Sequence, residues 1–195
     1  QLQVWYQPEV DLRGGEVVAF EALLRWNHPD GTVWTAQRFI DVAEDTGLIL
    51  DIGDWVLREA CQQGAAWSHR RPDRPLIVRV NVSALQLAEA GLLPAVDSAL
   101  NSSGLNPAWL CVEITETALL QETATARANL DGLHERGIGI AIDDFGTGYA
   151  SLTYLNSYPI DVIKIDRSFV SDTTRKQNRL VPGIIAFATT LGIAV

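Results

Sequence analysis

The chain has 195 residues, of which 47% are hydrophobic and 20% are charged, and its formal net charge at pH 7 is −9. This composition excludes a disordered chain and predicts a globular protein that buries a sizeable core, as one large domain or two small ones. The net negative charge argues against binding to nucleic-acid polymers, but it permits a small phosphorylated ligand held through divalent cations.

No apolar run approaches the roughly 18 residues of a membrane-spanning helix, and the first residues do not read as a signal peptide. We therefore expect no membrane contact by this domain and a cytoplasmic location, with any membrane anchor in other domains of the parent protein. The chain contains no methionine, so we expect a domain cut from a longer protein. Cys61 and Cys111 match no zinc-ligand spacing and are predicted to be buried free thiols in a reducing compartment.

The hydrophobic pattern predicts strands that alternate with helices. Residues 3–25 read as two extended segments joined by a glycine turn at 13–15. A helix is expected from an N-cap at Thr35 to about Gly47. The later segments are a helix over 52–69, a strand at 76–82, helical turns within 84–102, a strand at 109–114, a helix over 121–136, a strand at 137–142, a short helix within 151–157, a strand at 161–166 and a last helix that starts at Pro182.

This alternation predicts the α/β class, with a mostly parallel sheet covered by helices. An open doubly wound sheet and a closed barrel both fit the pattern, and the polar residues help to decide. A barrel gathers single residues from several strands at one face, whereas a doubly wound sheet concentrates its ligands at one switch point. The distribution over five strands favours the barrel, because polar residues end the segments at Glu21, Asn81, Glu113, Asp143 with Asp144, and Lys164.

Two adjacent aspartates, Asp143 and Asp144, follow the apolar run GIGIAI. Neighbouring carboxylates repel each other, so a cation is expected between them. Carboxylates and an amide, without thiolate or imidazole, suit hard cations such as Mg²⁺, Mn²⁺ or Ca²⁺. A pair of such ions holds the attacking and leaving oxygens in phosphoryl displacement. Gly146 and Gly148 would let the following loop turn tightly.

Each of these residues also has an ordinary interpretation. A single Glu, Asp or Asn at a strand end is more often a helix cap or a solvated turn residue. Lys164 alone would be a surface lysine, Glu116 a helix cap and Arg25 the partner of a surface acid. DFG also occurs in protein kinases, but no Gly-rich loop, strand lysine or HRD motif precedes it here. The recurrence of polar residues at the ends of several predicted strands favours a functional site over these separate explanations.

Together, seven segments resemble the EAL domain family, the cyclic di-GMP phosphodiesterases. In family order they are YQP at 6–8, EALLRW at 21–26, FIDVAEDTGLI at 39–49, VNVSALQL at 80–87, VEITET at 112–117, DDFGTGYASLTYL at 143–155 and IKIDRSFV at 163–170. The resemblance implies one EAL-type domain over 1–195, folded as a TIM-like (β/α) barrel with an antiparallel first strand. It also implies hydrolysis of cyclic di-GMP to linear pGpG with Mg²⁺ or Mn²⁺, and Ca²⁺ as an inhibitory ion.

The resemblance assigns roles to individual residues. It implies metal ligands at Glu21, Asn81, Glu113 and Asp143, with Asp144 reaching a second ion. Lys164 matches the lysine beside the attacking water, and it is grouped with Glu21, Asp143 and Asp144 as catalytic. Substrate-contacting positions match Gln7, Arg25 and Asp166, the last an acidic residue that supports the site. Glu116 resembles the glutamate that anchors the loop after DDFG.

Two departures from the family pattern bear on these roles. The chain ends at Val195, before the segment that carries a late glutamate and glutamine in the family, so the barrel is expected to be incomplete at its C-terminus. Leu85 stands where many relatives carry arginine. The alternatives are therefore a non-catalytic cyclic di-GMP sensor, a dimerisation module, or a two-metal barrel hydrolase of another phosphoester. Expected partners are cyclic di-GMP, a second copy in a homodimer, and neighbouring sensory or GGDEF-type domains.

Overall fold

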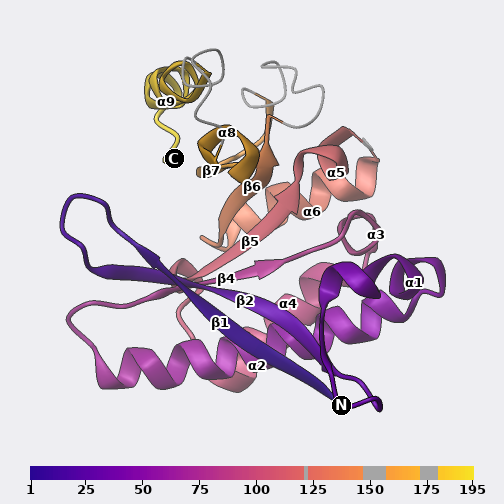
Figure 1. Ribbon diagram of the computed structural model, residues 1–195. Helices are drawn as coiled ribbons and strands as arrows, with labels where there is room; N and C mark the ends of the chain where they lie inside the picture. The colour runs from indigo at the N-terminus through magenta and orange to yellow at the C-terminus, as the bar shows by residue number, and fades with distance from the viewer. Residues whose placement is uncertain (121–122, 147–156, 172–179) are drawn as a thin grey trace.

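The computed structural model describes residues 1–120, 123–146, 157–171 and 180–195 (Figure 1). The strands are β1 (Leu2–Val10), β2 (Val17–Asn27), β3 (Val33–Thr35), β4 (Ile77–Asn81), β5 (Leu110–Thr115), β6 (Gly139–Phe145) and β7 (Val162–Ile165). The helices are η1 (Ala36–Arg38), α1 (Ile40–Asp45), α2 (Leu48–Arg70), α3 (Ala84–Leu87), α4 (Leu92–Ser103), η2 (Pro107–Trp109), α5 (Glu116–Leu120), α6 (Ala124–Glu135), α8 (Arg167–Ser171) and α9 (Leu180–Leu191).

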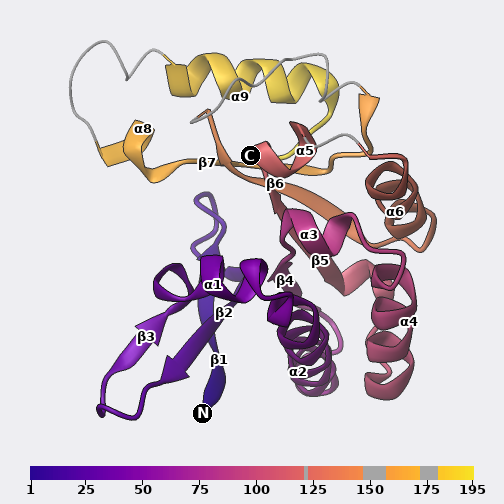
Figure 2. The same cartoon turned by 90° about the vertical axis from the view of Figure 1, so that its right-hand side faces the viewer.

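The described strands form one sheet in the order β1-β2-β4-β5-β6-β7, and β3 pairs with β2. β1 runs antiparallel to β2, whereas each step from β2 to β7 is parallel. The predicted α/β class with an antiparallel first strand is thus confirmed. Within the described residues the sheet turns strongly from β1 to β7 but does not close (Figure 2). Beyond β7, Val162 forms a single parallel bridge with Ala194.

The long helices pack along one face of this sheet (Figure 2), where the hydrophobic core lies. β4 shows how the sequence separates the two faces, because side chains alternate along a strand. Val78 and Val80 are buried in the core cluster. A Cβ added at Gly64 of α2 would lie 2.7 Å from Val78 Cγ2, so this glycine lets the helix approach the sheet closely. Arg79 and Asn81 lie on the opposite face, toward the inside of the curve.

Several predicted boundaries differ from the structure. The helix expected over 35–47 is a short η1 turn followed by α1, and Thr35 makes no side-chain cap bond. Gly47 has φ 74°, a left-handed turn that separates α1 from α2, so α2 starts at Leu48 rather than near 52. Pro182 is the third residue of α9, where its missing N–H costs little because first-turn donors lack helical partners.

Other predictions have mixed outcomes. β3 and α5 were not predicted, and the helical stretch within 84–102 is two helices, α3 and α4. Gly148 and residues 151–156 of the expected short helix lie outside the described residues. Cys61 and Cys111 are buried and not disulfide-bonded, as predicted. Across the described residues, the helices are too short or too polar to cross a membrane.

Candidate functional site

Three acidic side chains meet on the inner face of the sheet. Glu21 comes from β2, Glu113 from β5 and Asp143 from β6, and one carboxylate oxygen of each lies within 4.8 Å of the others. In the parallel register Glu113 pairs with Asn81 and Ala141, and Asp143 pairs with Thr115, so the three acids come from successive levels of the sheet. Residues 92 and 30 positions apart in sequence thus share one small volume, as the distribution of polar residues over the strands predicted.

Lys164 of β7 places its ammonium among these carboxylates. Its Nζ lies 2.6 Å from Glu113 Oε2, 3.1 Å from Glu21 Oε2 and 3.3 Å from Asp143 Oδ1. Burial alone would lower the pKa of Lys164, but the surrounding carboxylates outweigh burial and raise it. The carboxylates therefore favour the ammonium form of Lys164 at the centre of the cluster.

Glu113 is the most deeply placed acid, with 0% of its surface exposed. Burial raises its pKa to about 7, against the lowering effect of Lys164. Its Oε1 is one of three buried oxygens for which the described chain provides no hydrogen bond. The Nε of Arg79 lies 3.8 Å from that oxygen, too far for a hydrogen bond. An oxygen in this situation has a free lone pair for a cation that enters the cluster.

Beneath Glu113, Arg79 is buried in a network of its own. Its Nε donates to Glu9 Oε2 of β1 at 2.8 Å, and its Nη1 donates to Cys111 Sγ at 3.0 Å. Sequence reasoning did not find this layer, although a charged residue between Val78 and Val80 of a buried strand was a signal. Arg79 forms the floor of the acidic cluster.

Asn81 lies beside the cluster and bonds to one of its members. Its Nδ2 donates to Glu21 Oε1 at 2.9 Å, which leaves its carbonyl oxygen available. The chain then turns into α3 through a capping box between Ser83 and Gln86. Gln86 packs where α2 has Gly53, since a Cβ there would lie 1.8 Å from Gln86 Nε2. Gly53 therefore leaves room for the Gln86 side chain that completes the capping box of α3.

The two aspartates at the end of β6 are held differently. Asp143 belongs to the close cluster, whereas Asp144 lies outside it and has φ 53°, a left-handed conformation that is strained for a non-glycine residue. Burial, Asp143 and Asp166 raise the pKa of Asp144. Asp166 follows β7 and accepts bonds from the Ser168 amide and hydroxyl, which lower its own pKa.

Glu116 contacts the start of the loop after the aspartates. Its Oε2 accepts a 3.0 Å hydrogen bond from the Gly146 N–H. Gly146 has φ 101°, and a Cβ at this position would lie 2.9 Å from the Phe169 ring. Only glycine fits such a backbone conformation without strain. The rest of this loop, from residue 147, lies outside the described part of the chain.

An open cleft of 530 Å³ extends from the cluster. Arg25 lines it, and Gln7 lies opposite Glu21 in the β1–β2 register. The other polar residues that line the cleft are Glu21, Thr35, Gln37, Asp41, Glu44, Asn81, Ser83, Glu113, Thr115, Asp143 and Asp144. The structure thus places the predicted substrate residues Gln7 and Arg25 on the strands beside the acidic cluster.

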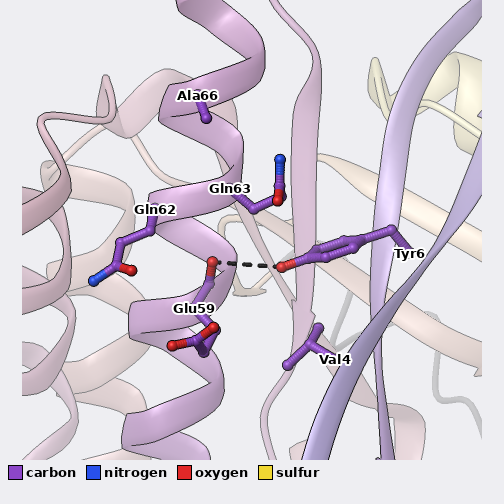
Figure 3. A pocket seen from close by; sticks show the side chains of 6 residues that line it. All are labelled: Val4, Tyr6, Glu59, Gln62, Gln63 and Ala66. Carbon is purple, nitrogen blue, oxygen red and sulfur yellow. Dashed lines mark hydrogen bonds between the residues drawn. The ribbon is translucent and has the colours of Figure 1, made fainter.

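A smaller hollow lies between β1 and α2 (Figure 3). Its volume is 290 Å³, and Tyr6 donates a long 3.4 Å bond to the Glu59 carbonyl at its edge. Burial, together with Glu59 and Cys61, raises the pKa of Tyr6 to about 12. This hollow shares no lining residue with the cleft, since it is lined by Val4, Tyr6, Glu59, Gln62, Gln63 and Ala66.

The family model for the EAL domain matches residues 1–195. This chain belongs to the EAL domain family. It is 40% identical over 200 residues to the bifunctional diguanylate cyclase/cyclic di-GMP phosphodiesterase MucR of Pseudomonas aeruginosa, covering 100% of this chain and 29% of MucR. It is 41% identical over 197 residues to the cyclic di-GMP phosphodiesterase NbdA of the same organism, covering 100% of this chain and 25% of NbdA.

Solved structures agree with the family and the fold. The phosphodiesterase PaMucR in complex with c-di-GMP superposes with a TM-score of 0.93 and 41% identity, covering 100% of this chain and 80% of that chain. The EAL domain therefore has the TIM-like α/β fold, of which the described strands form an open part. The chain spans less than a third of the length of MucR and NbdA.

Proposed function

We propose that this EAL domain is a metal-dependent phosphodiesterase that hydrolyses cyclic di-GMP to linear pGpG. One observation supports this most directly: Glu21, Glu113 and Asp143 converge within 4.8 Å, in a cleft that also contains Arg25. The relatives named as cyclic di-GMP phosphodiesterases provide the substrate class. The residues of this chain provide the chemistry.

The acidic cluster suits divalent cations by its donor set and its charge. Three carboxylates surround one ammonium, so negative charge is in excess. The unpartnered Oε1 of Glu113 and the carbonyl oxygen of Asn81 add hard oxygen donors. Glu21, Asn81, Glu113 and Asp143 would hold Mg²⁺ or Mn²⁺, and Asp144 would reach a second ion. When bound, such ions activate water and neutralise phosphate charge.

The remaining polar residues have proposed roles in substrate binding and charge neutralisation. The carboxylates around Lys164 raise its pKa and favour its ammonium form, which would stabilise negative charge on the phosphate. Arg25 offers a planar donor fork to a phosphate oxygen pair. Gln7 would contact the substrate from β1, and Asp166 would help to hold Asp144 in position. Glu116 fixes the start of the loop at Gly146.

The test is turnover by the full-length protein that contains this chain. We expect conversion of cyclic di-GMP to pGpG with Mn²⁺ or Mg²⁺, inhibition by Ca²⁺, and loss of conversion in Glu21→Gln. A matched control is Glu16→Gln, because Glu16 lies at the exposed β1–β2 turn and pairs with Arg74 there. Binding of cyclic di-GMP without product would instead support a sensor, and absence of both would support a dimerisation module.

Further predictions concern the setting of the domain. We propose that residues 1–195 act as one EAL-type unit whose neighbours include sensory or GGDEF-type domains, as the name of MucR describes for that relative. A homodimer and a cytoplasmic location stay predictions; the free thiols of Cys61 and Cys111 support the reducing compartment. Light scattering and fractionation of the full-length protein test them.

A further inference from the structure

Trp5 is an exposed aromatic side chain on β1, paired in the sheet with Leu23, which lines the cleft. Half of its surface, 50%, is exposed, although tryptophan is the largest apolar side chain. The other β-strand tryptophans are packed on rings, since Trp26 contacts Trp34. In the described part of the chain, Trp5 has no ring contact of this kind. An aromatic face left open beside a site is available to a flat ligand.

The β1–β2 register places Trp5 on the same face as the acidic cluster. Trp5 lies opposite Leu23, and Gln7 lies opposite Glu21. Directly opposed residues of antiparallel strands point to the same side, and so do residues two apart along one strand. Leu23, Glu21 and Arg25 all line the cleft. Trp5 therefore lies beside these lining residues, two positions along β1 from Gln7.

Two contacts orient the indole ring. Its Nε1–H donates to Gln3 Oε1 at 3.2 Å, two residues earlier on the same face of β1. The Arg25 guanidinium carbon lies 5.8 Å from the ring centre. The Gln3 contact is at the edge of the ring and Arg25 lies over one of its faces, while half of the residue's surface stays exposed to a ligand. The ring is thus held beside the residue proposed to bind a phosphate.

We infer that Trp5 is a specificity-determining residue that stacks on a purine base of the dinucleotide while Arg25 binds the adjoining phosphate. This inference rests on the proposed function and adds a base contact to it. Every base can stack on an aromatic ring, but the strength of stacking depends on ring area, so Trp5 would select for a purine over a pyrimidine by size and not by the identity of the purine.

The test measures binding of cyclic di-GMP to the full-length protein, with Ca²⁺ in place of Mn²⁺ and a check that no pGpG forms. We expect Trp5→Ala to bind about tenfold more weakly than wild type and Trp5→Phe to stay within about threefold. The cyclic dinucleotide of uridine should lose less affinity than cyclic di-GMP in Trp5→Ala. Leu12→Ala is the control, because Leu12 is 98% exposed at the far turn of the same hairpin.

Metal binding separates a stacking role from a structural one. Trp5→Ala should bind Mn²⁺ with the affinity of wild type, measured by calorimetry without nucleotide. Equal cyclic di-GMP affinity in wild type and Trp5→Ala would overturn the inference while the proposed function stands. Loss of Mn²⁺ affinity in both Trp5→Ala and Trp5→Phe would overturn it too, by showing that the ring supports the fold. A wild-type protein that binds no cyclic di-GMP would overturn the proposed function together with the inference.

Discussion

Two charged clusters of this domain differ in their balance of charge. On the surface, Arg136 forms a two-pronged pair with Asp97 of α4, with Nε–Oδ1 at 2.7 Å and Nη2–Oδ2 at 2.9 Å. One cation there meets one anion. Inside the cleft, the single ammonium of Lys164 faces three carboxylates within 3.3 Å. In the balanced pair the two charges neutralise each other, whereas the unbalanced cluster keeps excess negative charge and attracts cations.

Removing one charge from the unbalanced cluster should have the largest effect. Glu113→Gln keeps the size of the side chain but removes a buried negative charge and a proposed metal ligand. We expect turnover of cyclic di-GMP to fall more than about 100-fold, because even changes behind metal ligands cost 10–100-fold. Initial rates at saturating Mn²⁺ measure this. Asp97→Asn is the matched control and should keep wild-type rates; a Glu113→Gln enzyme within tenfold of wild type would remove Glu113 from the site.

Removing the ammonium tests the same balance from the other side. Lys164→Met leaves three carboxylates without their cation, so the free energy of unfolding should fall by about 3 kcal/mol, in the range for broken buried pairs. Mn²⁺ should restore more stability to this variant than it adds to wild type, since it replaces the missing charge. Thermal unfolding with and without Mn²⁺ measures both effects. An equal Mn²⁺ effect on the two proteins would contradict the idea that the carboxylates bind the ion.

Glu116 offers a smaller change next to the cluster. Glu116→Ala removes the acceptor of the Gly146 N–H, whereas Glu116→Gln keeps an oxygen at the same reach. We expect turnover to drop about tenfold in the alanine variant, since a hydrogen bond to a charged group contributes about 1.5–3 kcal/mol. The glutamine variant should lose less. Steady-state kinetics that show equal losses would mean that the carboxylate charge, rather than the hydrogen bond, is what Glu116 supplies.

The sequence predicted the convergence at the cleft better than it predicted local boundaries. Polar residues that end apolar runs, such as Glu113 after WLCV, are visible in one dimension, and parallel strands must bring their ends together. The start of α2 was missed because one left-handed residue, Gly47, decides it. The pair between Arg79 and Glu9 joins residues 70 positions apart. Which acid pairs with Arg79 depends on strand register, and composition and periodicity do not specify that register.

The balanced surface pair should show the smallest effect and a defined pH dependence. The hydrogen bond from Arg136 lowers the pKa of Asp97 below its ordinary value, so the folded state binds a proton less readily than the unfolded state. The stabilisation is therefore complete above the unfolded pKa of about 3.9 and is lost as pH falls through the lower folded pKa. For an exposed pair it is about 1 kcal/mol or less. Urea unfolding of wild type and Asp97→Asn from pH 7 to pH 3 should show a difference that shrinks below about pH 4. If the stability of wild type relative to Asp97→Asn increased with acid, the charged form of Asp97 would be destabilising. The pair between Arg136 and Asp97 would then not neutralise its own charge, and the contrast with the acidic cluster in the cleft would fail.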